Sequence, residues 1–229
     1  MPSLLHRSRL AIACLAVLTP LATASAARAD RGGVAHGGVD EPMLMQTAYV
    51  APHVPCSERY IEHPFAAWDD NADYFLIREG DLGSDAHYDW SLGTSELVAE
   101  NNPNSLHGVE TSALALDEGD SAESPMFCVT VDDPTARFFV KNTGAETGTL
   151  RLDAIYLDEN FEEHTYQLGT LTSADAGNEW TPSPVLELAA PLVELLDENQ
   201  TPVTFRFTAE GEGSSWLVDD VYVDPYGKG

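Results

Sequence analysis

Positively charged residues are scarce in this sequence. Only 11 lysines and arginines stand against 38 aspartates and glutamates, which gives a net charge of −27 at neutral pH. Nucleic acids and anionic membrane surfaces both require a basic patch on the protein, so this balance argues against either partner. The acidity is compatible with solubility at high salt, with divalent-cation binding, or with a solvated surface that keeps molecules apart.

The first 29 residues have the pattern of a secretory signal peptide. Arg7 and Arg9 precede an apolar stretch from Leu10 to Ala24, and Ala27-Arg28-Ala29 supplies small residues before a cleavage site after Ala29. We therefore expect a secreted protein with a net charge of −30, because cleavage removes three arginines and no acid. The apolar stretch is too short for a membrane anchor, so we expect no membrane insertion after cleavage.

Cysteine is nearly absent. Of three cysteines, Cys14 lies in the predicted signal peptide, which leaves Cys56 and Cys128. An even count in an exported protein predicts one disulfide between them.

Catalytic motifs are also lacking. The sequence has no nucleophile elbow, no zinc-protease motif, no phosphate-binding glycine loop and no pair of histidines at metal-ligand spacing. We expect no enzyme. A hydrolase stays the less favoured alternative, since carboxylate pairs occur throughout the chain and single out no catalytic pair.

The rest of the chain divides into a leader and one domain. Residues 30–55 are rich in glycine and proline without a sustained period, which predicts a flexible leader. Residues 56–229 contain short strand candidates at close intervals and no long helix, which predicts an all-β domain of two packed antiparallel sheets. Among these candidates, residues 150–157 and 164–168 form a predicted hairpin, and residues 88–93 begin another strand.

The last strand candidate, residues 214–226, carries two adjacent acids. Side chains alternate across a strand, so Asp219 or Asp220 must face the buried side unless a bulge turns both outward. A buried carboxylate requires a cation, a metal ion or several hydrogen-bond donors.

Three short stretches carry a resemblance to a known class of protein. Glu79-Gly80-Asp81-Leu82, Trp90-Ser91-Leu92-Gly93 and the strand from Trp216 to Val223 resemble parts of jelly-roll, galactose-binding-like carbohydrate-binding modules. The frame from Trp68 to Tyr226 also resembles uncharacterised secreted β-sandwich proteins of actinobacteria. The resemblance implies that the two antiparallel sheets form a jelly roll.

The same resemblance implies a structural calcium ion. In the carbohydrate-binding relatives, the opening turn and the last-strand aspartate hold this ion, and the matching ligand candidates here are Glu79, Asp81, Asp219 and Asp220. Gly83 departs from the pattern, because it stands where the relatives have a turn glutamate. Alternatively, the aspartate pair accepts backbone N–H bonds or pairs with Arg78 or Arg206.

Sugar binding by a β-sandwich needs exposed aromatic rings, since the C–H groups of a pyranose pack on a ring face. Trp90 and Trp216 lie in strand-like stretches and are expected in the core. The predicted ligand contacts are the loop tryptophans and three tyrosines: Trp68, Trp180, Tyr166, Tyr156 and Tyr88. Alternatively, a loop tryptophan merely caps the end of the sandwich.

The sequence thus predicts a secreted, non-catalytic module that binds a glycan or another cell-surface component. The main alternative is an extracellular structural or interaction protein without a small ligand. In that case all four tryptophans would be shielded from solvent. Neither reading specifies a particular sugar or an oligomeric state.

Overall fold

The computed structural model describes residues 59–225, apart from 84–85, 109–110, 131, 134, 158–161 and 189–200. The predicted signal peptide, the leader at 30–55 and Cys56 lie outside the described residues, so secretion and the Cys56–Cys128 disulfide stay predictions. None of the described helices has the length and apolar character needed to cross a membrane.

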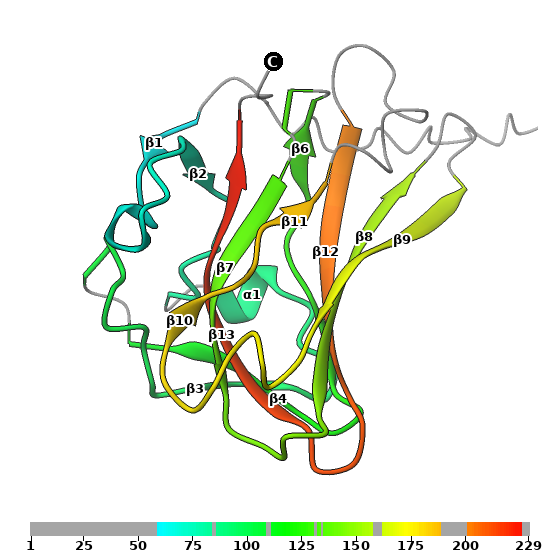
Figure 1. Ribbon diagram of the computed structural model, residues 1–229. Helices are drawn as coiled ribbons and strands as arrows, with labels where there is room; N and C mark the ends of the chain where they lie inside the picture. Colours follow the sequence, from blue (N-terminus) through cyan, green and yellow to red (C-terminus); the bar gives the residue numbers. More distant parts are fainter. Residues whose placement is uncertain are drawn as a thin grey trace, which may run out of the picture. The chain divides into compact units, whose positions relative to one another are not determined.

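The described residues form two antiparallel sheets, as the sequence predicted, in a jelly-roll sandwich (Figure 1). Sheet A contains β1 (Ile61–Glu62), β2 (Tyr74–Leu76), β3 (Glu96–Val98), β4 (Ala113–Asp117), β7 (Thr135–Asn142), β10 (Thr181–Pro182), β11 (Leu186–Glu187) and β13 (Ser215–Asp224). Sheet B contains β5 (Ser121–Glu123), β6 (Phe127–Val129), β8 (Thr149–Leu157), β9 (Glu163–Leu171) and β12 (Thr201–Glu210).

Alternation along β12 shows why the two sheets pack together. Its odd-numbered residues from 201 to 209 are buried, and its even-numbered residues are partly exposed. β12 pairs with β8 along eight positions, and β8 pairs with β9 in the predicted hairpin. One face of sheet B is therefore apolar and packs on sheet A, while the other face is open to solvent.

Aromatic residues dominate the core between the sheets. The rings of Phe138 and Phe207 meet edge to face with centroids 5.1 Å apart, across the two sheets. Trp90 and Trp216 are both buried, which confirms their expected place in the core.

A smaller apolar cluster lies on the outer face of sheet A. It consists of Phe65, Tyr74, Phe139 and Tyr222, with the Phe65 and Tyr74 rings 4.9 Å apart. Phe139 points outward because its neighbours Phe138 and Val140 point into the main core. The 3₁₀ turn η1 (Ala66–Trp68) follows Phe65, so this cluster anchors the first part of the domain on sheet A.

The strand predicted over residues 88–93 is wrong. The structure has a short helix, α1 (Ala86–Asp89), which ends as the Trp90 backbone N–H donates to the Ala86 carbonyl at 2.8 Å. The buried Trp90 indole donates from Nε1 to the Glu79 carbonyl at 2.9 Å. This tertiary contact fixes Trp90 next to the Glu79 turn, and only Ser91 bridges to a strand, through Glu123.

Of the two alternatives for the adjacent acids of β13, one acid on the buried side or a bulge, the structure has the bulge. The pairing of β13 with β7 shifts between Asp219 and Tyr222, and Asp220 adopts a left-handed conformation with φ of 47°. The extra residue lets both carboxylates contact the same loop residue, Asn102, while Val218 and Val221 stay in the main core.

Candidate functional site

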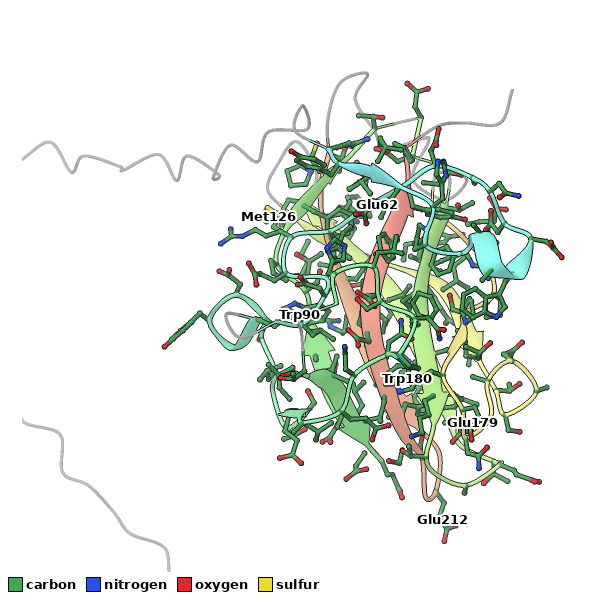
Figure 2. The ribbon with its side chains drawn as sticks, turned by 90° about the vertical axis from the view of Figure 1, so that its left-hand side faces the viewer. Glu62, Trp90, Met126, Glu179, Trp180 and Glu212 are labelled. Atoms are coloured by element: carbon green, nitrogen blue, oxygen red, sulfur yellow. The ribbon has the colours of Figure 1, made fainter. Side chains whose placement is uncertain are left out.

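The structure brings the two predicted loop tryptophans to the same cluster. The Trp68 ring lies 5.5 Å from the Phe139 ring in an edge-to-face contact and is 38% exposed. Trp180, labelled in Figure 2, also packs on this cluster, and its indole Nε1 is buried without a hydrogen-bond partner among the described residues. The structural-protein alternative expected four shielded tryptophans, and Trp68 does not meet that expectation.

The three predicted tyrosines lie elsewhere. Tyr156 of β8 is buried and stacks on His164 of β9 with ring centroids 5.3 Å apart. Tyr166 is 42% exposed on β9, and Tyr88 is 80% exposed on α1. The five aromatic candidates therefore do not form one surface, and their contact with a ligand stays a prediction.

The last-strand aspartates lie beneath the loop that contains Asn102. Asp219 accepts hydrogen bonds from the backbone N–H groups of Asn102 and Asp220 at 2.9 and 2.8 Å. Asp220 accepts from the Asn102 side-chain amide at 3.0 Å and from the Ser105 hydroxyl at 3.1 Å. The sequence alternative in which this pair accepts backbone N–H bonds therefore describes the Asp219 contacts.

The electrostatic setting of this pair is strongly negative. Burial, and then the neighbouring charge of Asp220, raise the pKa of Asp219 to about 8. Burial also raises the pKa of Asp220, although the Asn102 and Ser105 hydrogen bonds and the charge of His107 lower it. The nearby Tyr222 hydroxyl has a raised pKa because of its burial and the charges of Asp220 and Glu62.

The other predicted calcium ligands differ in their placement. Asp81 is close enough to raise the pKa of both last-strand aspartates, whereas Glu79 occupies a strained turn position with φ of 51°. No three acidic, histidine or cysteine side chains within the described residues are grouped to hold a metal ion. Calcium here would need backbone carbonyls and water in addition to Asp81 and a last-strand aspartate.

Neither of the two arginines proposed as partners forms an ion pair with Asp219 or Asp220. Arg78 instead pairs with Asp89 at 2.8 Å, and Arg206 pairs with Glu123 at 2.6 Å.

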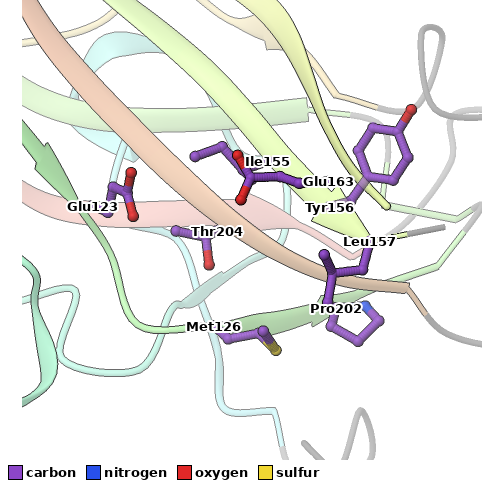
Figure 3. Close-up of a pocket in the computed structure, with 8 residues that line it drawn as sticks. All are labelled: Glu123, Met126, Ile155, Tyr156, Leu157, Glu163, Pro202 and Thr204. Atoms are coloured by element: carbon purple, nitrogen blue, oxygen red, sulfur yellow. The ribbon is translucent and has the colours of Figure 1, made fainter. Parts of the chain in front are cut away.

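A pocket of about 180 Å³ opens on the solvent face of sheet B (Figure 3). Its lining comes from the strands β5, β8, β9 and β12 and from the segment between β5 and β6: Glu123, Met126, Ile155, Tyr156, Leu157, Glu163, Pro202 and Thr204. The volume is below the roughly 300–1,000 Å³ typical of drug-sized ligands, so the pocket suits one sugar ring or one short side chain.

The lining combines an apolar base with oxygen acceptors. Met126, Ile155 and Pro202 contribute apolar surface, and Thr204 contributes a hydroxyl. Figure 3 shows Glu163 extending from β9 toward the other lining residues, whereas the Tyr156 ring points away from them. These eight residues line what is referred to below as the sheet B pocket.

Sequence reasoning found only Tyr156 of the sheet B pocket. The sequence signal that could have found the others is alternation. Positions 155 and 157 on β8, and 202 and 204 on β12, point away from the core, because the residues that alternate with them are mostly apolar and lie in the core. Placing them next to Glu123 and Glu163 required the strand register, which the alternation does not provide.

Comparisons with known proteins concern the fold. No protein-family model and no curated protein matches the chain. The xylan-binding domain CBM22-1 from Paenibacillus barcinonensis is a similar solved structure, with a TM-score of 0.46 and 12% identity, over 69% of this chain and 97% of that one.

Two further solved structures are larger than the matched region. One contains CBM22-1 and GH10 modules of a Clostridium thermocellum endo-1,4-β-D-xylanase with xylohexaose, with a TM-score of 0.45, 20% identity, and 60% of this chain covered. The other is the enzymatically active domain of bacteriophage CBA120 tailspike protein 4, with a TM-score of 0.42, 13% identity, and 65% of this chain covered. The match spans 26% and 21% of those two chains, respectively.

Proposed function

We propose that this protein is a secreted, non-catalytic binding module for a glycan or another cell-surface component, and that the sheet B pocket is its contact surface. One observation carries the proposal: an apolar base lies between two carboxylates and a hydroxyl on an open sheet face. The C–H groups of a sugar ring can pack on Met126 and Ile155, while Glu163 and Thr204 accept hydrogen bonds from its hydroxyls.

Affinity electrophoresis in gels containing xylan, mixed-linkage β-glucan or β-galactan tests this function. The wild-type protein is expected to be retarded by at least one polysaccharide. Met126→Ala combined with Glu163→Ala should weaken that retention about tenfold or more, corresponding to a loss of about 1.4 kcal/mol of binding free energy.

Trp68→Ala is the matched control, because Trp68 lies on the outer face of sheet A. It should leave retention unchanged. If Trp68→Ala abolishes retention and the pocket variant does not, the aromatic surface predicted from the sequence is the binding site instead. Wild-type protein that no polysaccharide or cell-wall preparation retains would contradict the binding function altogether.

A structural calcium ion held by Asp81 and by Asp219 or Asp220 belongs to the same proposal. Its support is the placement of the acids: Asp219 and Asp220 are buried next to each other in β13, and Asp81 is close enough to act on both carboxylates. Glu79 would be a further calcium ligand, held in a turn where its backbone is strained.

A further inference from the structure

The charge of the sheet B pocket narrows the class of ligand. We propose that the pocket prefers a glycan that bears free amino groups, such as a glucosamine polymer, over neutral or acidic glycans. This inference rests on the proposed function, since it assigns the ligand class of the same pocket.

Glu163 supplies the first part of the argument. It is exposed at the beginning of β9, and its side chain makes no hydrogen bond or ion pair with any described residue. Its carboxylate is therefore available to a ligand without breaking a contact of the folded protein. An ammonium group binds such a carboxylate through charge-assisted hydrogen bonds, which are roughly twice as strong as the neutral hydrogen bonds that a sugar hydroxyl offers.

Glu123 supplies a second carboxylate from another strand of the same sheet. Its Oε1 accepts hydrogen bonds from Arg206 at 2.8 Å, which fixes the side chain, and no bond within the described part of the chain uses its Oε2. None of the eight lining residues is a lysine, arginine or histidine. The pocket thus presents oxygen acceptors without a cation of its own, apart from the guanidinium of Arg206 beside it.

The apolar base separates this pocket from a simple acidic patch. Met126, Ile155 and Pro202 can receive the C–H face of a sugar ring, and Thr204 can bond a ring hydroxyl. An amino sugar offers both features, a C–H face and an ammonium group. The net charge of −27 acts in the same direction, because it attracts cationic polymers and repels those that carry uronate or sulfate groups.

The test is calorimetric titration with three oligosaccharides of equal length: a glucosamine oligomer, its N-acetylated counterpart and a neutral xylo-oligosaccharide. Titrations are run at a pH where the amine is protonated, in 0.15 M and 0.5 M salt, because salt screens general attraction. The glucosamine oligomer is expected to bind at least tenfold more tightly than the other two. Glu163→Gln should reduce its affinity to that of the N-acetylated oligomer.

Glu212→Gln is the matched control, because it removes the same charge from an exposed turn. Figure 2 shows Glu212 at the opposite end of the domain from Met126. This variant should bind all three oligosaccharides as the wild-type protein does. Equal losses in Glu163→Gln and Glu212→Gln would overturn the inference in favour of general charge attraction.

Two other outcomes separate this inference from the proposed function. If neutral and aminated oligosaccharides bind equally and pocket variants weaken both, the preference for amines is wrong and glycan binding stands. If no glycan binds, both proposals fail. Polylysine is titrated as well. If it binds more tightly than the glucosamine oligomer, and if Glu163→Gln abolishes its binding, the occupant of the pocket is a protein side chain and the inference is overturned.

Discussion

Asp219 is a carboxylic acid that the fold favours in its protonated form. It is fully buried, it lies next to Asp220 in the chain, and its pKa is raised to about 8. In the unfolded chain the same group titrates near its ordinary value of 3.8. Between these two values the folded state binds more protons than the unfolded state, so this group makes stability fall as pH rises from about 4 to about 8.

Asp219→Asn should therefore flatten the pH dependence of stability over this range. The wild-type free energy of unfolding is expected to decline with pH, by up to about 1.4 kcal/mol per unit from this group alone. Urea unfolding at pH 5, 6, 7 and 8 measures the slope. The variant removes the titration, although it also replaces one acceptor oxygen by an amide donor, so the informative quantity is its slope rather than its absolute stability.

Asp132→Asn is the control for this measurement. Asp132 is exposed in the loop after β6, and its described hydrogen bond is made by its backbone N–H rather than by its carboxylate. Its slope should match the wild-type slope. A wild-type protein whose stability does not fall between pH 5 and 8 would contradict the protonated state of Asp219.

At the scale of elements, the bulge in β13 and the loop from residue 99 to 108 depend on each other. The bulge turns Asp219 and Asp220 toward Asn102, whose backbone and side chain bond one carboxylate each. Ser105 adds a bond to Asp220, and Lys141 of β7 reaches Glu100 at 2.5 Å. These contacts fasten a segment without regular structure onto the outer face of sheet A.

Asn102→Ala tests this attachment. It removes the amide that bonds the buried Asp220 carboxylate, and the free energy of unfolding should fall by about 2 kcal/mol at pH 7. Asn104→Ala is the matched change in the same loop, because Asn104 is exposed and, among the described residues, its side chain bonds only Asn102. That variant should cost about 0.5 kcal/mol or less. Equal losses in the two variants, measured by urea unfolding, would show that Asn102 has no special role.

The elements that the sequence predicted well are those with local patterns. The hairpin of β8 and β9 and the strand β12 follow from alternation along the chain. For the adjacent acids of β13 the sequence left a buried acid and a bulge as alternatives, and the structure has the bulge. The segment around Trp90 was mistaken for a strand because its helical turn is fixed by a contact with the distant Glu79 carbonyl. The sheet B pocket was missed for the same reason, because Ile155 and Thr204 become neighbours only through the pairing of β8 with β12.

At the scale of the whole molecule, the negative charge and the proposed calcium site make different predictions. Thermal unfolding is compared in calcium, magnesium and sodium chloride at equal ionic strength, and in a chelator. A site filled only in the folded state stabilises by about 2.7 kcal/mol at a hundredfold excess over Kd. The midpoint should rise in calcium alone, and Asp220→Asn should abolish the rise.

If the unfolding midpoint is the same in calcium, magnesium and sodium chloride, the salts act only by screening the net charge of −27, and the calcium site is wrong. In that case the hydrogen bonds from Asn102 and Ser105 would suffice to hold the aspartate pair. The composition predicts the acidity of the whole molecule, but it does not distinguish these outcomes. Calcium binding depends on how closely Asp81 approaches Asp219 and Asp220, which lie almost 140 positions later in the chain.

The order of strands at one side of sheet A has a practical consequence for protein engineering. Phe75 of β2 pairs with Ile61 of β1 on one side and with Val223 of β13 on the other, which places the first and last described strands about 10 Å apart across the ladder. Figure 1 shows β1 and β2 at the end of the domain where β13 finishes, away from the turn between β12 and β13. A circular permutant that joins β13 to β1 by a short linker and opens the chain at Glu212 would keep every described strand register.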